Sequence, residues 1–127
     1  CEFVVDTRIV PHDKNIQRIQ QCDVYIELFA PEQNGKPYGC FGVTAFEAAS
    51  MGKIVLTQNL NQHIYEQTYG DQIFLCAETE EHFKNNIEFL LSHRHHIKPM
   101  QELHREMMVK RHSLKATGER LKKILNL

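Results

Sequence analysis

The chain has 127 residues, of which 42% are apolar and 24% charged, with a formal net charge of −1. This length predicts one domain, residues 1–127, that buries roughly two thirds of the surface of the unfolded chain. No apolar run approaches the roughly 18 residues of a membrane-spanning helix, and the amino end lacks the basic start and the apolar stretch of a signal peptide.

The first part of the chain predicts a strand, a helix, a second strand and a loop. Residues 3–10 are rich in β-branched side chains and predict an extended first strand that Pro11 ends. Asp13 is a candidate cap for the helix that follows. Residues 23–29 predict the second strand, and residues 31–37 are a loop by composition.

A glycine-containing loop then leads into a short helix with one carboxylate. Gly39 and Gly42 lack a Cβ, so the backbone can approach a bulky anion, and the unpaired N–H groups at the helix start offer an anion site. Glu47 lies further into the helix, where it could accept hydrogen bonds from a sugar diol. Gly52 ends the helix, and residues 54–57 predict a strand covered on both faces. Phosphate donors beside a diol acceptor suggest a nucleotide or nucleotide-sugar site.

The rest of the chain predicts one more strand and then helices. Residues 73–76 are a second short apolar run, and a helical pattern begins at Thr79. Two further helices are expected, split near Pro99 and again near residues 112–113. The last of them has an apolar side, formed by Leu114, Leu121, Ile124 and Leu125.

Strands that alternate with helices predict an α/β fold, a Rossmann-like parallel sheet with flanking helices and a helical C-terminal tail. In such sheets ligands bind beyond the carboxyl ends of the strands, at a loop that leads into a helix. The loop before Gly42 occupies that kind of place. The three helical segments at the end suggest a tail that packs back across the domain or onto a neighbour.

The charges are unevenly distributed. Residues 1–92 contain 6 Lys/Arg and 13 Asp/Glu, a net charge of −7, whereas residues 93–127 contain 9 and 3, a net charge of +6. A basic tail can bind nucleic acid or anionic lipid. We favour a solvated helical face beside an acidic partner surface and expect no nucleic-acid partner, although the tail permits peripheral contact with the inner face of a membrane.

The cysteines and histidines show no metal-site pattern. Four cysteines lack close pairing or metal-ligand spacing: Cys1, Cys22, Cys40 and Cys76. This favours a reduced, cytoplasmic setting. Three histidines lack an acidic companion at ligand spacing and are interpreted as a surface connection between helices: His93, His95 and His96. His104 and His112 are interpreted as structural or exposed, and no metal is expected.

The same residues also allow simpler interpretations than a nucleotide site. The short helix could be a packing helix whose glycines only permit close contact with strands. Glu47 could be a surface carboxylate, although Phe46 and Ala48 beside it are apolar or small. Four polar residues after the strand predicted over residues 54–57 could contact a sugar or form a plain loop: Asn59, Asn61, Gln62 and His63.

Three segments carry a family resemblance. Residues 41–55 read Phe-Gly-Val-Thr-Ala-Phe-Glu-Ala-Ala-Ser-Met-Gly-Lys-Ile-Val, which resembles the Phe-Gly-x-x-x-x-Glu-Ala-Met-Ala-x-Gly-x-Pro-Val motif of GT-B glycosyltransferases. The relevant group is the large retaining one that includes sucrose synthase and many bacterial mannosyl- and glucosyltransferases. Residues 23–26 resemble the Ala-Asp-Val strand before that motif. Residues 109–113, Val-Lys-Arg-His-Ser, resemble its closing Val-x-x-x-His-(Ser/Asp) element, with one residue fewer between Val and His. The resemblance is to the C-terminal, donor-binding half and covers nearly the whole chain.

The resemblance implies roles for the motif residues. Glu47 would hold the ribose hydroxyls of the nucleotide, and the segment near Val10 would lie close to the base. The implied donor-binding set is Gly39, Cys40, Phe41, Gly42, Val43, Thr44 and Glu47. The donor would be a UDP-, GDP- or ADP-sugar, bound without an obligatory metal. A glycan or lipid-linked acceptor would be held by a separate N-terminal domain, so we expect a part of a larger enzyme that is inactive alone.

The chain departs from the family pattern at one position. The family's first Glu falls eight residues before the second, where this chain has Gly39. That Glu contacts the donor sugar, and Glu27 or Glu32 could take its place; no catalytic residue is assigned. Two alternatives remain open. One is an enzyme of the same architecture, such as a sugar-nucleotide epimerase or a phosphorylase, and the other is a non-catalytic domain that binds nucleotide sugar or serves as a scaffold.

Overall fold

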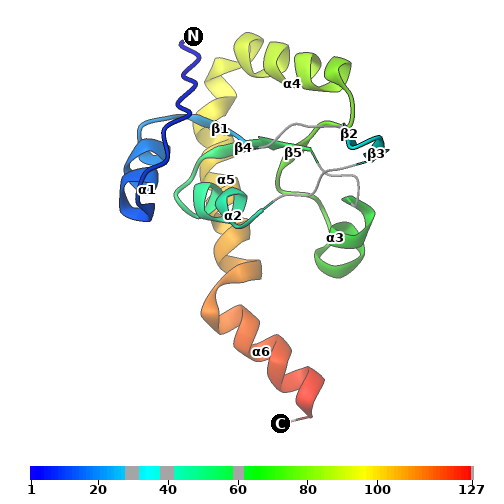
Figure 1. The fold of residues 1–127 in the computed structure, drawn as a ribbon. Helices are drawn as coiled ribbons and strands as arrows, with labels where there is room; N and C mark the ends of the chain where they lie inside the picture. Colours follow the sequence, from blue (N-terminus) through cyan, green and yellow to red (C-terminus); the bar gives the residue numbers. More distant parts are fainter. Residues whose placement is uncertain (28–31, 38–41, 59–61, 127) are drawn as a thin grey trace.

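The computed structural model describes residues 1–27, 32–37, 42–58 and 62–126. It contains a three-stranded parallel sheet flanked by helices and a helical C-terminal region (Figure 1), which confirms the predicted α/β class. The elements follow in the order α1 (His12–Gln20), β1 (Val24–Ile26), β2 (Glu32–Gln33), β3 (Lys36–Pro37), α2 (Val43–Ser50), β4 (Ile54–Thr57), α3 (Gln62–Tyr69), β5 (Leu75–Cys76), α4 (Glu80–Ser92), a 3-10 turn η1 (Arg94–His96), α5 (Ile97–His112) and α6 (Leu114–Leu125).

The central strand of the sheet is β4. The strand order is β1-β4-β5, both pairings are parallel, and Val24 is paired with Ile54 and Leu56 with Leu75. Ile54, Val55 and Leu56 have no exposed surface, as predicted for a strand covered on both faces. Figure 1 shows α4 above the sheet and α2 below it.

Small residues bring α2 close to the sheet. Ala45, Ala48 and Ala49 have no exposed surface and lie in the core with Val55, and α2 contacts both β4 and α5. The helix ends at Ser50 with Met51 as its C-cap, within one residue of the end at about Met51 that the sequence predicts. Because the fully buried residues of α2 are all alanines, its backbone can lie near the backbone of its neighbours.

An aromatic cluster links α2, α3, α5 and the segment before β5. Its members are Phe46, Tyr65, Tyr69, Phe74 and His112. The ring of Phe46 meets those of Phe74 and His112 edge-on, with centroids 5.5 and 4.9 Å apart. The Tyr65 hydroxyl and His112 Nε2 are 2.8 Å apart and share a hydrogen bond. This confirms a structural role for His112.

Residues 1–10 do not form the predicted first strand. The apolar side chains of Phe3, Val4 and Val5 are 65–76% exposed, because among the described residues no strand pairs with them. β-Branched residues favour a strand only where a neighbouring strand supplies hydrogen bonds and a packing face.

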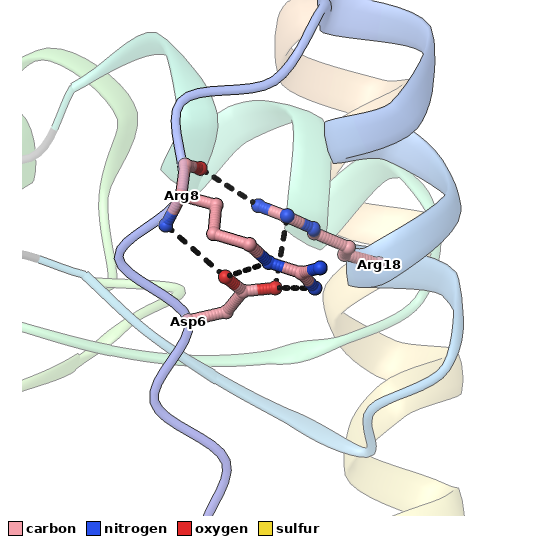
Figure 2. Close-up of polar contacts among 3 residues, drawn as sticks. All are labelled: Asp6, Arg8 and Arg18. Carbon is pink, nitrogen blue, oxygen red and sulfur yellow. Dashed lines mark hydrogen bonds and ion pairs between the residues drawn. The ribbon is translucent and has the colours of Figure 1, made fainter.

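An ion-pair cluster attaches this segment to α1 instead (Figure 2). The Asp6 carboxylate accepts hydrogen bonds from Arg8 Nε at 2.9 Å and lies 2.9 Å from Arg18 Nη2, while Arg18 Nη1 donates to the Arg8 carbonyl at 3.1 Å. The hydrogen bonds from Arg8, with the charge of Arg18, hold the pKa of Asp6 well below its usual range.

Three further details differ from the sequence prediction. Pro11, not Asp13, precedes the first residue of α1, and Asp13 lies in the first turn, where a carboxylate suits the positive end of the helix. The loop predicted over residues 31–37 contains the antiparallel pair β2–β3. Its turn residues Asn34 and Gly35 have φ of +54° and +71°, the left-handed conformation that an Asn-Gly hairpin turn requires.

The third difference is α3, a helix that the sequence did not predict. Its only buried residue is Tyr65, and Ile64 is 55% exposed, so the segment lacks a clear apolar stripe. The strand predicted over residues 73–76 is shorter than expected, with only Leu75–Cys76 paired.

The C-terminal helices follow the prediction closely. Thr79 caps α4, its hydroxyl accepting from the His82 N–H at 3.1 Å. Pro99 lies inside the first turn of α5, where a missing N–H costs no helical hydrogen bond. Ser113 separates α5 from α6 and caps α6, accepting from the Ala116 N–H at 3.2 Å. Of these helices, α5 contacts α2 and β4, so it packs back across the domain as expected.

Replacing Leu56 by alanine tests the central strand. The side chain has no exposed surface, so Leu56→Ala should lower the free energy of unfolding by about 2–5 kcal/mol in urea titrations. Leu121→Ala, at a side chain that is 52% exposed, is the matched control and should change it by less than about 1 kcal/mol. Equal losses in the two variants would contradict the assignment of β4 to the core.

The buried His104 and the half-buried His112 predict that stability falls on acidification. Burial lowers the pKa of His104, and burial together with Arg120 and Arg111 lowers that of His112. Below about pH 6.5 these two histidines therefore bind more protons in the unfolded chain than in the folded chain. The free energy of unfolding should decrease from about pH 7.5 to about pH 5.5. His112→Phe keeps a ring in the cluster and should flatten this dependence, and an unchanged slope would contradict the role of His112.

Candidate functional site

The predicted helix start lies at the carboxyl end of β1. Strand β1 ends at Ile26 and Glu27 follows directly, while Gly42 precedes the first residue of α2. The helix connects β1 to the parallel strand β4, so its N-terminus is at the edge of the sheet where α/β proteins bind ligands. Gly39, Cys40 and Phe41 lie outside the described residues.

A carboxylate of the chain itself occupies the start of α2. Glu27 Oε2 accepts a hydrogen bond from the Gly42 N–H at 3.0 Å, and Glu27 Oε1 accepts one from the Thr44 hydroxyl at 2.5 Å. A Cβ at position 42 would lie 2.9 Å from Glu27 Oε1, so any larger residue there would push the Glu27 carboxylate out of this position. The positive end of the helix thus binds an oxyanion through two of the predicted residues.

Tyr25 is close enough to Glu27 and Glu47 to feel the charge of both carboxylates. Burial raises the pKa of its phenol, a hydrogen bond with Thr44 acts against this, and the charges of Glu27 and Glu47 add to the rise. The residue is half-buried in the middle of β1. Tyr25 was not among the candidates chosen from the sequence, although its position two residues before Glu27 on a short strand places both side chains on one face.

Glu47 lies beside the start of α1. Its side chain is 26% exposed, and its Oε1 is 3.4 Å from Nε2 of His12. His12 is two residues after Val10, in the segment that the resemblance places near the base. The remaining candidate, Val43, is 75% exposed at the first position of α2.

We call this group the helix-start site. It comprises His12, Tyr25, Glu27, Gly42, Thr44 and Glu47. Its residues come from α1, β1 and α2, so it forms only when the three elements pack. Chemically it combines two donors for an oxyanion with a partly exposed carboxylate that can accept from hydroxyl groups.

The other polar candidates lie elsewhere. Gln62 and His63 begin α3, where Gln62 Nε2 donates to Glu66 Oε1 at 2.7 Å, so they are not in a plain loop; Asn59 and Asn61 are outside the described residues. Glu32 is exposed on β2. The histidines of residues 93–96 are exposed around the η1 turn, which confirms the surface connection.

The described residues contain neither a metal-site candidate nor a helix that could span a membrane. Among them, no group of three or more His, Cys, Asp and Glu side chains is arranged to hold a metal ion. Within the same part of the chain, no helix has the length and apolar character needed to cross a membrane. Of the cysteines that the structure describes, Cys1, Cys22 and Cys76 are free thiols.

Comparison of the chain with protein-family models, with curated proteins and with solved structures found no match in any of the three. The functional assignment therefore depends on the residues of the helix-start site.

Removing the Glu27 carboxylate should weaken the fold. Glu27→Ala leaves the Gly42 N–H and the Thr44 hydroxyl without their partner and should lower the free energy of unfolding by about 1–2 kcal/mol. Glu32→Ala is the matched control, because Glu32 is exposed, and it should change stability by less than about 0.5 kcal/mol. If urea titrations gave the same free energy of unfolding for the two variants, the capping role of Glu27 would be contradicted.

Proposed function

We propose that the chain is the nucleotide-sugar-binding domain of a glycosyltransferase of the GT-B type, with the helix-start site as its donor site. The observation that supports this is the carboxylate of Glu27 on the Gly42 N–H and the Thr44 hydroxyl. A donor diphosphate likewise presents negatively charged oxygens that accept hydrogen bonds. In the proposed complex it replaces the Glu27 carboxylate at the positive end of α2.

Glu47 is the proposed ribose ligand. Its carboxylate is partly exposed and lies on the same helix as the proposed phosphate donors. Two neighbouring hydroxyls of a ribose can both donate to one carboxylate. The closeness of His12 to Glu47 also supports a nucleoside position between α1 and α2, with the base near Val10.

The proposed chemistry is electrostatic. When the sugar–phosphate bond breaks, negative charge develops on the leaving diphosphate, and helix-terminal N–H groups that already point at it stabilise that charge. The donor is a UDP-, GDP- or ADP-sugar and transfer proceeds with retention. The acceptor, a glycan or a lipid-linked molecule, is bound by a second domain that closes over the site. The chain alone is therefore expected to bind the donor rather than turn it over.

A second candidate is a non-catalytic nucleotide-sugar-binding domain. Two observations favour it: Gly39 stands where the family has a carboxylate, and Glu27 fills the proposed phosphate position. In that case ligands bind the isolated chain equally well, but the whole protein shows no transfer across a broad acceptor panel.

Ligand-induced stabilisation tests the proposed site. UDP, GDP and ADP and their sugars should be screened by thermal shift, and a ligand at 100 times its dissociation constant should add about 2.7 kcal/mol to the free energy of unfolding. Glu47→Ala should reduce the shift, whereas Glu88→Ala, at an exposed position on α4, should leave it unchanged. No shift with any of these ligands would contradict the proposal.

Glu27→Ala locates the phosphate in the same experiment. Without the competing carboxylate, a nucleoside diphosphate should bind this variant more tightly than the unaltered chain. Equal affinities would place the phosphates away from the start of α2.

A further inference from the structure

The C-terminal helix α6 presents its apolar side to solvent. Leu114, Leu121 and Leu125 are 94%, 52% and 61% exposed, and Ile124 beside them is 73% exposed. Spacings of seven and four residues put the three leucines on one side of the helix. Figure 1 shows α6 leading away from the sheet beyond the end of α5.

The contacts that attach α6 to the domain come from another side of the helix. The Arg120 guanidinium lies over the Tyr69 ring, 5.1 Å from its centroid, and donates to the Arg111 carbonyl and to the Thr117 hydroxyl. Ser113 caps the first turn. The contacts of Arg120 with the aromatic cluster fix the rotation of α6 about its own axis. In this orientation the leucine side faces away from the domain.

The charge around α6 is strongly positive. Residues 109–126 contain six Lys/Arg and one Glu, a net charge of +5. Lys115 and Lys122 are exposed, and each follows a leucine of the apolar side in the sequence. Lys122 forms an ion pair with Glu119 at 3.4 Å. Both side chains of this pair are exposed to solvent, so the interaction is weak. Both ammonium groups can reach an external anionic surface while their stems lie along the apolar side.

From these features we infer that α6 docks on an anionic membrane surface. The leucine side enters the boundary between headgroups and acyl chains, and Lys115 and Lys122 contact the lipid phosphates. A second copy of this chain fits the same side poorly, because pairing two α6 helices would bring two segments of charge +5 together. The inference does not depend on the proposed nucleotide-sugar function.

Vesicle co-sedimentation of the full chain tests this inference. Vesicles of phosphatidylcholine mixed with phosphatidylglycerol should bind the chain, whereas pure phosphatidylcholine vesicles should bind it much less. Binding should weaken as NaCl is raised from about 50 to about 200 mM. Leu121→Gln should lower the partition coefficient by about tenfold, and Lys122→Gln by about fivefold.

Leu103→Gln is the matched control. Leu103 and Leu121 are both 52% exposed, but Leu103 lies on α5. The control should bind vesicles like the unaltered chain, and circular dichroism should show the same helix content in all variants. Failure to bind anionic vesicles, or equal losses for Leu103→Gln and Leu121→Gln, would overturn the inference. So would a concentration-dependent dimer that Leu121→Gln abolishes without any vesicle binding, since a second copy would then cover α6.

Discussion

The close packing of α2 against the central strand β4 is the contact on which the rest of the structure depends. Three alanines, Ala45, Ala48 and Ala49, form the buried side of α2 and leave no space between the helix and its neighbours. A larger side chain at any of them would have to displace β4 or α5, because protein interiors are already close-packed. This packing fixes where α2 begins, and therefore which residues of β1 and α1 can reach its N-terminus.

The helix-start site follows from that placement. Glu27 directly follows β1 and meets the N–H and hydroxyl donors at the start of α2, which compensate its charge. The same arrangement links stability to the proposed function. An anion that binds at the start of α2 must replace the hydrogen-bonded carboxylate of Glu27. The free energy of this exchange is the difference between the interaction energies of the two anions with the same donors. The site thus favours ligands that carry more charge or more acceptor oxygens than a single carboxylate.

The C-terminal region has a different character. The aromatic cluster holds α5 and α6 to the domain through the Tyr65–His112 hydrogen bond and through Arg120 on Tyr69. Beyond it, α6 carries exposed leucines in a basic segment, while the helix-start site contains Glu27 and Glu47 and lies in the acidic part of the chain. The proposed donor site and the inferred membrane surface therefore belong to separate parts of the chain, which have opposite net charges.

The sequence by itself determined the features that depend on neighbours along the chain. These include the apolar strand at residues 54–57, the end of α2 near Gly52, the Thr79 cap and the break at Ser113, because local sterics and hydrogen bonds decide them. Only the tertiary structure decided which residues meet across 15 or more positions of the chain, such as Glu27 with Gly42 and His12 with Glu47. It also decided that the leucines of α6 face outward. It also decided that residues 1–10 stay unpaired, since β-branched residues form a strand only where another strand lies beside them. Periodicity shows which residues share a side of a helix, but packing decides whether that side meets the core, a ligand or solvent.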